Sequence, residues 1–176
     1  MPKSSQEQID SDDKKIVDEL RKNSKESIDK IAKKCGFSRQ KVWRTIKRME
    51  KNNIIWGYCA VIDDTKFNQN RYFLLIKRTS KPIQKENLQL VMSRELKDRA
   101  DERGVSIECS HYVHGVYDWV ICVNAPDIRN VKKYIESLND LAKEGFISDI
   151  QVLESIFPIE KNGIINPKLE EFNDFF

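Results

Sequence analysis

The stretch from Ser38 to Lys51, SRQKVWRTIKRMEK, constrains the fold of this chain more than any other. Val42, Ile46 and Met49 recur at helical spacing, so one stripe of a helix is apolar and needs a core to cover it. Ser38 precedes this stripe and is a good N-cap, because its hydroxyl can accept a bond from a free backbone N–H. The other faces carry six cations and a single acid. We therefore predict a helix with an apolar back and a cationic front.

A cationic helix on its own is as typical of a solvated protein surface as of a helix that binds an anionic partner. The segment that precedes it distinguishes these two interpretations. Residues 24–37, SKESIDKIAKKCGF, predict a short amphipathic helix that is capped by Ser27 or Ser24. Gly36 can adopt the left-handed conformation that ends a helix. A helix, a glycine turn and a cationic helix in this order predict a helix-turn-helix.

The second helix of such a motif enters the major groove of double-stranded DNA with its N-terminal residues first. Arginine and glutamine side chains match the edges of guanine and adenine, whereas cations further along meet phosphates. The residues predicted to lie in the groove are Ser38, Arg39, Gln40, Lys41 and Arg44. Those predicted to contact phosphates are Lys47, Arg48 and Lys51.

Charge and composition agree with this interpretation. Residues 1–53 have a net charge of +6, whereas the remaining residues have a net charge of −3. The N-terminal third is therefore the predicted partner of nucleic acid. No apolar run approaches the roughly 20 residues that span a bilayer, and no signal peptide is visible. Four cysteines without paired spacing suit a reducing compartment, so we expect a cytoplasmic protein without membrane contact.

Two further elements complete the N-terminal region. Asp10 or Ser11 is predicted to cap a first helix that runs to about Lys22. Directly after the cationic helix, Ile54 to Asp63 (IIWGYCAVID) is apolar and β-prone, which predicts a strand. A strand at this position makes the predicted helix-turn-helix a winged one.

The next region alternates between strand and helix patterns. The predicted order is strand, helix, strand, strand, helix and strand, over residues 72–76, 82–103, 105–111, 116–123, 126–145 and 147–157. This βαββαβ order is ferredoxin-like, with two helices on one face of a four-stranded antiparallel sheet. Both faces of strand 116–123 are apolar, whereas the helices cover only one. An uncovered apolar face predicts self-association.

Two of these elements carry more specific predictions. Leu88, Met92 and Leu96 are predicted to form one stripe of the helix over 82–103. In the following strand, alternation predicts that four residues share one face: Val105, Ile107, Cys109 and His111.

The predicted fold class is α+β, with a winged helix-turn-helix followed by a ferredoxin-like α/β sandwich. The predicted boundaries are 1–53 for the DNA-binding domain and 54–70 for a linking strand and turn. The ferredoxin-like oligomerisation domain follows over 71–158, and a polar, acidic tail occupies 159–176. The family resemblance given below implies that the domain over 71–158 also binds an effector.

Three segments resemble the Lrp/AsnC (leucine-responsive, feast/famine) family of transcription regulators. Residues 9–20, IDSDDKKIVDEL, are similar to the family's opening pattern, and residues 35–58, CGFSRQKVWRTIKRMEKNNIIWGY, resemble its recognition helix. Residues 107–127, IECSHYVHGVYDWVICVNAPD, resemble the hairpin of its amino-acid-sensing domain.

The resemblance implies homodimers built through the C-terminal sheets, which often assemble into tetramers or octamers. It also implies a small effector, usually an amino acid, near the turn that contains His114, Gly115, Tyr117 and Asp118. His114 stands where the family usually has a small hydroxyl residue. The strand before the turn is one residue longer than is usual, the first sensing-domain helix is longer and more charged, and the tail after Pro158 is additional.

Other functions have less support in the sequence. Cys109, His111 and His114 contain metal-ligating atoms but lack an evident fourth ligand, so no metal is predicted. No nucleophile motif, phosphate loop or cofactor motif accompanies Asp118 and Glu108, so we expect neither an enzyme nor a cofactor. Two alternatives stay open: an architectural DNA-binding protein that needs no effector, and a ferredoxin-like metabolite-binding protein.

Overall fold

The computed structural model of the chain describes residues 6–83, 85–138 and 145–176. The chain divides into two compact units. The first comprises Met1–Val61 and Ile159–Phe176, and the second comprises Ile62–Pro158. Within the described residues, no helix combines the length and the apolar character that crossing a membrane requires.

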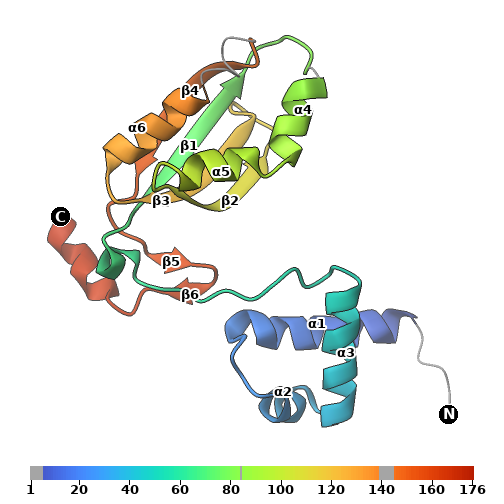
Figure 1. Cartoon of the computed structure of the whole chain (residues 1–176). Coiled ribbons are helices and arrows are strands. Elements are labelled where there is room, and N and C mark those ends of the chain that lie inside the picture. Colours follow the sequence, from blue (N-terminus) through green and yellow to red (C-terminus); the bar gives the residue numbers. More distant parts are fainter. Residues whose placement is uncertain (1–5, 84, 139–144) are drawn as a thin grey trace. The chain divides into compact units, whose positions relative to one another are not determined.

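Three helices form the start of the first unit (Figure 1): α1 (Gln6–Lys22), α2 (Ile28–Cys35) and α3 (Arg39–Lys51). The predictions for α2 and α3 are confirmed, because Ser27 and Ser38 cap them and Gly36 adopts a left-handed φ of 70°. The predicted start of α1 was wrong, since the helix begins at Gln6 and runs through Asp10 and Ser11.

The core of this unit lies where the three helices meet. Each helix contributes part of it, and the buried side chains are Ile16, Ile31, Ala32, Val42, Ile46 and Met49. The apolar stripe of the cationic segment is therefore buried as predicted, and Thr45 joins it. Burying this stripe fixes the rotation of α3 about its own axis.

The predicted wing strand does not form. Residues 54–63 contain no strand, and the side chain of Trp56 is 93% exposed. A strand needs a neighbour to satisfy its backbone groups, and the strands nearest in this unit, β5 (Glu160–Lys161) and β6 (Ile164–Ile165), pair with each other. β propensity without an available pairing partner did not suffice here.

The tail has more structure than its polar composition predicted. β5 and β6 form a short hairpin, and η2 (Leu169–Phe175) is a 3₁₀ helix. Asn162 and Gly163 both have positive φ in the hairpin turn, 50° and 81°. Asn-Gly is the favoured pair for such a turn, so the signal was present in the sequence.

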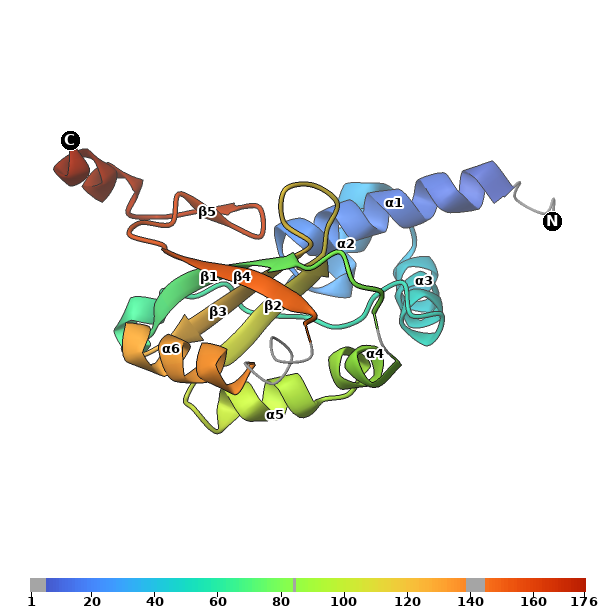
Figure 2. The ribbon, with the colours of Figure 1, turned by 90° about the horizontal axis from the view of Figure 1, so that it is seen from above.

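The second unit is built on a four-stranded antiparallel sheet with the order β2-β3-β1-β4. Its strands are β1 (Asn70–Arg78), β2 (Ser106–Tyr112), β3 (Trp119–Ala125) and β4 (Ile147–Glu154). A 3₁₀ turn, η1 (Asp64–Phe67), precedes β1. The helices α4 (Lys85–Met92), α5 (Glu95–Asp101) and α6 (Ile128–Ser137) lie on one face of the sheet (Figures 1 and 2). This is the predicted ferredoxin-like order.

The core lies between this sheet and its helices. Alternate residues of β1 and β3 enter it, and the strand residues involved are Tyr72, Leu74, Ile76, Trp119, Ile121, Val123 and Ala125. Tyr134 of α6 is also fully buried. The opposite face of the sheet, which none of the described helices of this unit covers, carries Phe73, Leu75, Val120, Cys122 and Leu153. We call it the open face.

Two predicted elements differ in extent. The helix predicted over 82–103 is two helices, and Met92 is 84% exposed. Ser93 separates them: its hydroxyl donates to the Leu90 carbonyl and accepts from the Glu95 N–H. A serine side chain that competes for backbone groups in this way favours a helix break. α6 covers Ile128–Ser137, with Leu138 as its C-cap. The rest of the predicted helix, residues 139–144, lies outside the residues that the structure describes.

The hairpin of β2 and β3 also departs from the prediction. β3 begins at Trp119, so Val116 lies in the preceding loop and is 74% exposed. A register shift interrupts β2 between Ile107 and Cys109. Such a bulge places two residues opposite one and reverses the alternation of side chains. Ile107 packs on the helix-covered core, whereas Cys109 and His111 lie on the open face and are exposed.

Candidate nucleic-acid interface and loop site

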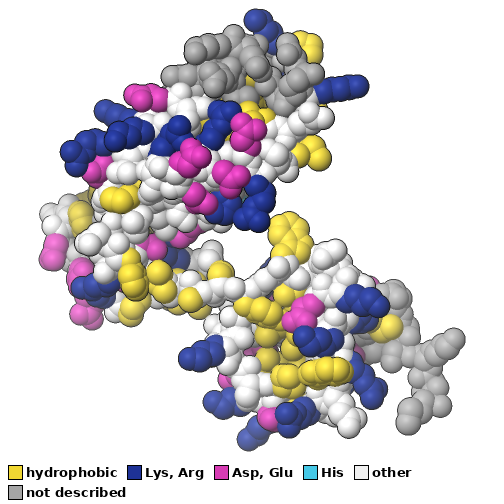
Figure 3. Space-filling model, in the orientation of Figure 1, with side chains coloured by type: hydrophobic (Ala, Val, Ile, Leu, Met, Phe, Trp, Pro, Cys, Tyr) yellow, Lys and Arg dark blue, Asp and Glu magenta, His cyan; other side chains and the backbone are white. Residues whose placement is uncertain are grey.

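The packing of α3 determines which of its side chains face outward. Four residues, Val42, Thr45, Ile46 and Met49, are buried on one side of the helix. At 3.6 residues per turn the opposite side carries Gln40, Arg44, Lys47 and Lys51, and all four are exposed. We call this set the outer face of α3. Figure 3 shows Lys and Arg side chains around this helix with exposed hydrophobic side chains between them.

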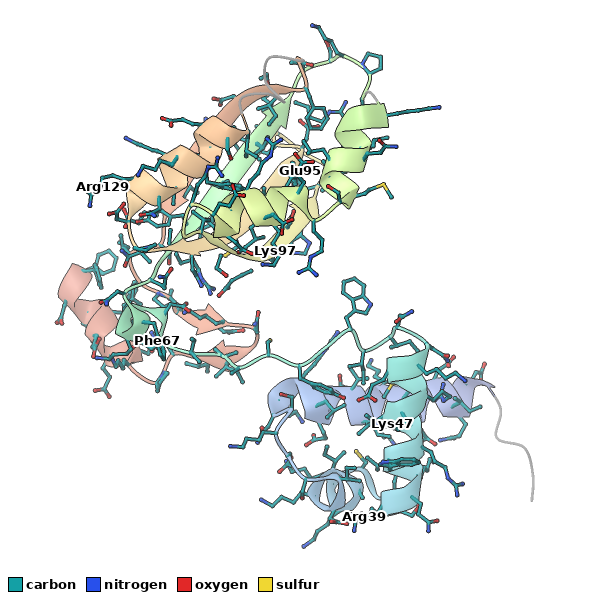
Figure 4. The ribbon with its side chains drawn as sticks, in the orientation of Figure 1. Arg39, Lys47, Phe67, Glu95, Lys97 and Arg129 are labelled. Atoms are coloured by element: carbon teal, nitrogen blue, oxygen red, sulfur yellow. The ribbon has the colours of Figure 1, made fainter. Side chains whose placement is uncertain are left out.

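The first turn of α3 is anchored to its neighbours. Ser38 accepts a hydrogen bond from the Lys41 N–H, so its hydroxyl serves as the helix cap. The Arg39 Nε lies 3.5 Å from a carboxylate oxygen of Asp29, and both side chains are exposed. Figure 4 labels Arg39 at the start of α3 and Lys47 further along the helix. Arg39 therefore stays accessible to a ligand.

Two of the predicted DNA contacts point toward α1. The Lys41 Nζ lies 2.5 Å from a carboxylate oxygen of Asp12, which is only 6% exposed, and also 4.1 Å from the centre of the Phe37 ring. Arg48 donates from one guanidinium nitrogen to both carboxylate oxygens of Asp13, at 2.5 and 2.6 Å. Both cations thus hold α3 to α1.

These ion pairs change the acids involved. The hydrogen bond from Lys41 lowers the pKa of Asp12, against the opposing effect of burial. On the outer side of α3, hydrogen bonds from Lys47 and Tyr58 lower the pKa of Glu50. At neutral pH both acids are ionised. The single acid of α3 is therefore matched by a cation one turn away.

Trp43 lies beside the outer face and is 51% exposed. A strand at Ile54–Trp56 would offer this ring a surface to pack on, and DNA is the alternative partner. No strand forms there. Trp43 is therefore an accessible aromatic side chain next to the cations.

A second candidate site is the loop between β2 and β3. Asp118 fixes this loop to β1: its Oδ2 accepts a hydrogen bond from the Arg78 N–H at 2.8 Å, and its own N–H donates to the Ile76 carbonyl at 3.0 Å. The Asp118 carbonyl also accepts from the Val113 N–H at 2.8 Å. The carboxylate at the centre of the predicted effector site is therefore part of the loop's structure as well.

The other predicted effector residues lie in the same loop. His114 and Gly115 are exposed, and Tyr117 is half-buried. The Tyr117 hydroxyl lies 2.5 Å from the Gln151 Oε1, on the open face of the sheet. The loop therefore carries a carboxylate, a phenol and an imidazole, and the phenol reaches the open face.

Comparisons with known proteins agree with both halves of the structure. Residues 9–50 match the model of the AsnC-type helix-turn-helix domain. An uncharacterized HTH-type transcriptional regulator of Pyrococcus abyssi is 41% identical over 61 residues, which are 35% of this chain and 39% of that protein. The proline dehydrogenase transcriptional activator of Rhodobacter capsulatus is 25% identical over 88% of this chain and 96% of its own length.

A solved structure gives the same result for the fold. The feast or famine regulatory protein of M. tuberculosis, in complex with L-methionine, superposes with a TM-score of 0.64 at 18% identity. The match covers 87% of this chain and 95% of that one.

The fold and the cationic helix define a helix-turn-helix protein with a ferredoxin-like second domain. Within that class residues 9–50 form an AsnC-type helix-turn-helix domain, and the Rhodobacter capsulatus relative that matches most of the chain is a transcriptional activator. This chain spans 39% of the length of the Pyrococcus abyssi relative that it matches at 41% identity.

The Lys41–Asp12 pair generates a prediction about stability and pH. Because the pKa of Asp12 in the folded state lies below the ordinary value of 3.8, the pair stabilises the fold above pH 3.8. This contribution is lost as the pH falls through the lower, folded-state pKa. Asp12→Asn should therefore lower the melting temperature at pH 7, and the difference from wild type should shrink in strongly acidic buffer.

Asp18→Asn, on the same helix, is the matched control, and it should change the melting temperature little at either pH. A deficit of Asp12→Asn that is equally large at pH 7 and below pH 3 would contradict an ionic origin.

Proposed function

We propose that this chain is a sequence-specific, DNA-binding transcriptional regulator. The observation that carries the proposal is the outer face of α3, where three cations and a glutamine are exposed on the side opposite to a fully buried stripe. A helix presented in this way fits the major groove, where arginine and glutamine read base edges. Because such a regulator has to reach chromosomal DNA, we also propose that the protein is cytoplasmic.

We propose that the predicted DNA contacts fall into three groups. The groove contacts that we propose are Arg39, Gln40 and Arg44, with Ser38 as the cap at the helix start. Lys47 and Lys51 lie further along the outer face and are proposed to meet phosphates. We propose that Lys41 and Arg48 act mainly by holding α3 to α1, because each is already paired with a carboxylate.

Substitutions within α3 test this division. Arg44→Ala should weaken binding to the preferred site by about 1–3 kcal/mol and relax specificity at one position per half-site. Lys51→Ala should weaken binding to all DNA about equally and flatten its salt dependence. Lys41→Ala, which removes the same charge from the same helix, should reduce stability more than DNA affinity. Binding is measured by fluorescence anisotropy at several salt concentrations.

The preferred site for that assay comes from selection out of random DNA at near-physiological salt. Selection without an enriched sequence, together with a steep salt dependence, would instead favour the architectural alternative. An effect of Lys41→Ala on affinity as large as that of Arg44→Ala would contradict the proposed division of α3.

We further propose that the chain acts as a homodimer or a larger homo-oligomer joined through the open face. Leu153 is 51% exposed there, and Phe73, Leu75 and Val120 are half-buried beside it without a helix of the same unit above them. An apolar sheet face of this kind favours association. A dimer would also present two recognition helices to successive major grooves.

Sedimentation analysis tests the assembly. The full-length protein should be at least a dimer at micromolar concentration. Leu153→Asp should shift it toward the monomer, because a charge would be buried at the interface. Met92→Asp is the matched control: Met92 is 84% exposed on the helix-covered side, so the assembly should persist. A monomeric wild-type protein would contradict the proposal.

We propose that the β2–β3 loop binds an amino acid. The Asp118 carboxylate would hold its ammonium group, and Tyr117 and His114 would line the site. The proposal is supported by the carboxylate and aromatic groups gathered in one loop and by the M. tuberculosis fold relative that was solved with L-methionine.

Thermal shift tests the effector. One of the common amino acids at millimolar concentration, with L-methionine as the first probe, should raise the melting temperature. The screen is run at pH 6 and at pH 8. Asp118→Asn should abolish it without unfolding the protein, since an amide oxygen can still accept from the Arg78 N–H. Asp149→Asn, an exposed acid of β4, is the control. The absence of any shift at both pH values would leave an effector-independent regulator.

A further inference from the structure

Arg39, the first residue of α3, lies beside a carboxylate of the preceding helix. The Asp29 Oδ1, in the first turn of α2, is 3.5 Å from the Arg39 Nε. The Arg39 side chain is 71% exposed and the Asp29 side chain is 65% exposed. Figure 4 shows Arg39 at the end of α3 that lies next to α2. The pair therefore stands on the surface, at the end of α3 that a major groove receives first.

The nitrogen that Asp29 engages is one that base reading does not need. A guanidinium carries one N–H on Nε and two on each terminal nitrogen, all in one rigid plane. Bidentate contact with the O6 and N7 of guanine uses two donors side by side. Within the described part of the chain, neither terminal nitrogen of Arg39 has a hydrogen-bond partner. A carboxylate on the Nε side thus leaves a complete pair of donors for a base.

Arg48 of the same helix shows the opposite arrangement. It donates from a terminal nitrogen to both carboxylate oxygens of Asp13, and the Asp13 side chain is largely buried. Lys41 likewise uses its only side-chain nitrogen on the buried Asp12. These two cations are bound through the atoms that would reach DNA. Arg39 is instead held from the side, by an acid that itself stays in solvent.

An exposed pair of this kind contributes little to stability. Two charges in water attract each other weakly, so such pairs add little to the free energy of unfolding. A groove that closes over the pair removes water, and the attraction between the two charges then strengthens. In the complex the carboxylate opposes rotation of the guanidinium toward a phosphate, which DNA of every sequence offers. The pair therefore acts on DNA binding and not on folding.

We propose that Asp29 is a positioning residue that sets specificity: it holds Arg39 by Nε, so that the two terminal nitrogens meet the O6 and N7 of a guanine. This role rests on the proposed function, binding of α3 in the major groove. It gives Asp29 two effects of opposite sign. The carboxylate favours one base contact through Arg39, whereas its charge repels phosphates and weakens binding to DNA of every sequence.

Fluorescence anisotropy with the full-length protein tests this role. The probes are the duplex that selection from random DNA enriches, versions of it with one base pair changed, and an unrelated duplex of equal length. Arg39→Ala first identifies the G·C pair that Arg39 reads, as the position where the preference falls. We expect Asp29→Ala to lower the preference at that same pair by roughly three- to tenfold, part of the roughly 5- to 150-fold that a bidentate contact supplies. The same variant should bind the unrelated duplex roughly two- to fivefold more tightly at low salt, because one repelling charge is gone.

Two further variants separate positioning from charge. Asp29→Asn keeps an oxygen that can accept from Arg39 but lacks the charge. It should bind the unrelated duplex as tightly as Asp29→Ala does and retain more of the preference. Asp18→Asn, which removes a negative charge from α1, is the matched control and should leave the preference unchanged. Melting curves of the two Asp29 variants should stay close to that of the wild type, because the pair is exposed.

A double-mutant comparison isolates the path through Arg39. In the Arg39→Ala background, Asp29→Ala should no longer change the preference at any pair. A change that persists there would mean that Asp29 contacts a base itself, and equal weakening of all duplexes by Asp29→Ala would mean a structural role. Either result overturns the proposal, as does an unchanged preference in Asp29→Ala. Selection that enriches no sequence would instead contradict the proposed function itself.

Discussion

The burial of one stripe of α3 controls much of what this chain presents to its surroundings. A helix has a single rotational setting once Val42, Ile46 and Met49 are packed against α1 and α2. That setting leaves Gln40, Arg44, Lys47 and Lys51 on the outside. It also turns Lys41 and Arg48 toward the acids of α1, where Asp12 and Asp13 meet them. The burial of this stripe thus determines which cations of α3 face outward and which pair with the acids of α1.

A similar constraint operates in the sheet unit. The three helices cover one face of the sheet, and the residues of β1 and β3 that alternate with the core point to the other. That open face combines half-buried apolar side chains with the ion pairs of Arg71 to Asp64 and Glu108. The loop with Asp118 lies at its border. Association and effector binding, as proposed, therefore both concern the same layer of the protein.

Local signals predicted most of the fold correctly. Ser27, Ser38 and Gly36 mark helix ends through their own backbone and side-chain chemistry, and the structure uses each as expected. The βαββαβ order also follows from periodicity alone. By contrast, the strand expected at 54–63 depended on a pairing partner, and β propensity does not specify one. The break at Ser93 comes from side-chain competition within an otherwise helical pattern.

The candidate sites divide in the same way. Which residues of α3 are cationic is visible in the sequence, but which of them are engaged by α1 is a tertiary property. The pairing of Lys41 with Asp12 joins residues of different helices and has no local signature. The bulge in β2 was equally hidden, because regular alternation placed Cys109 beside Ile107. Only the observed register shows Cys109 opposite Cys122.

The segment that follows α3 belongs to the first unit, although it forms neither helix nor strand. Ile55 packs against the core of the three helices, and the Tyr58 hydroxyl donates to a carboxylate oxygen of Glu50 at 3.0 Å. The chain that leaves α3 therefore folds back on the last turn of that helix. A substitution at Tyr58 would loosen this turn, where Lys47 and Lys51 are exposed, without touching either cation.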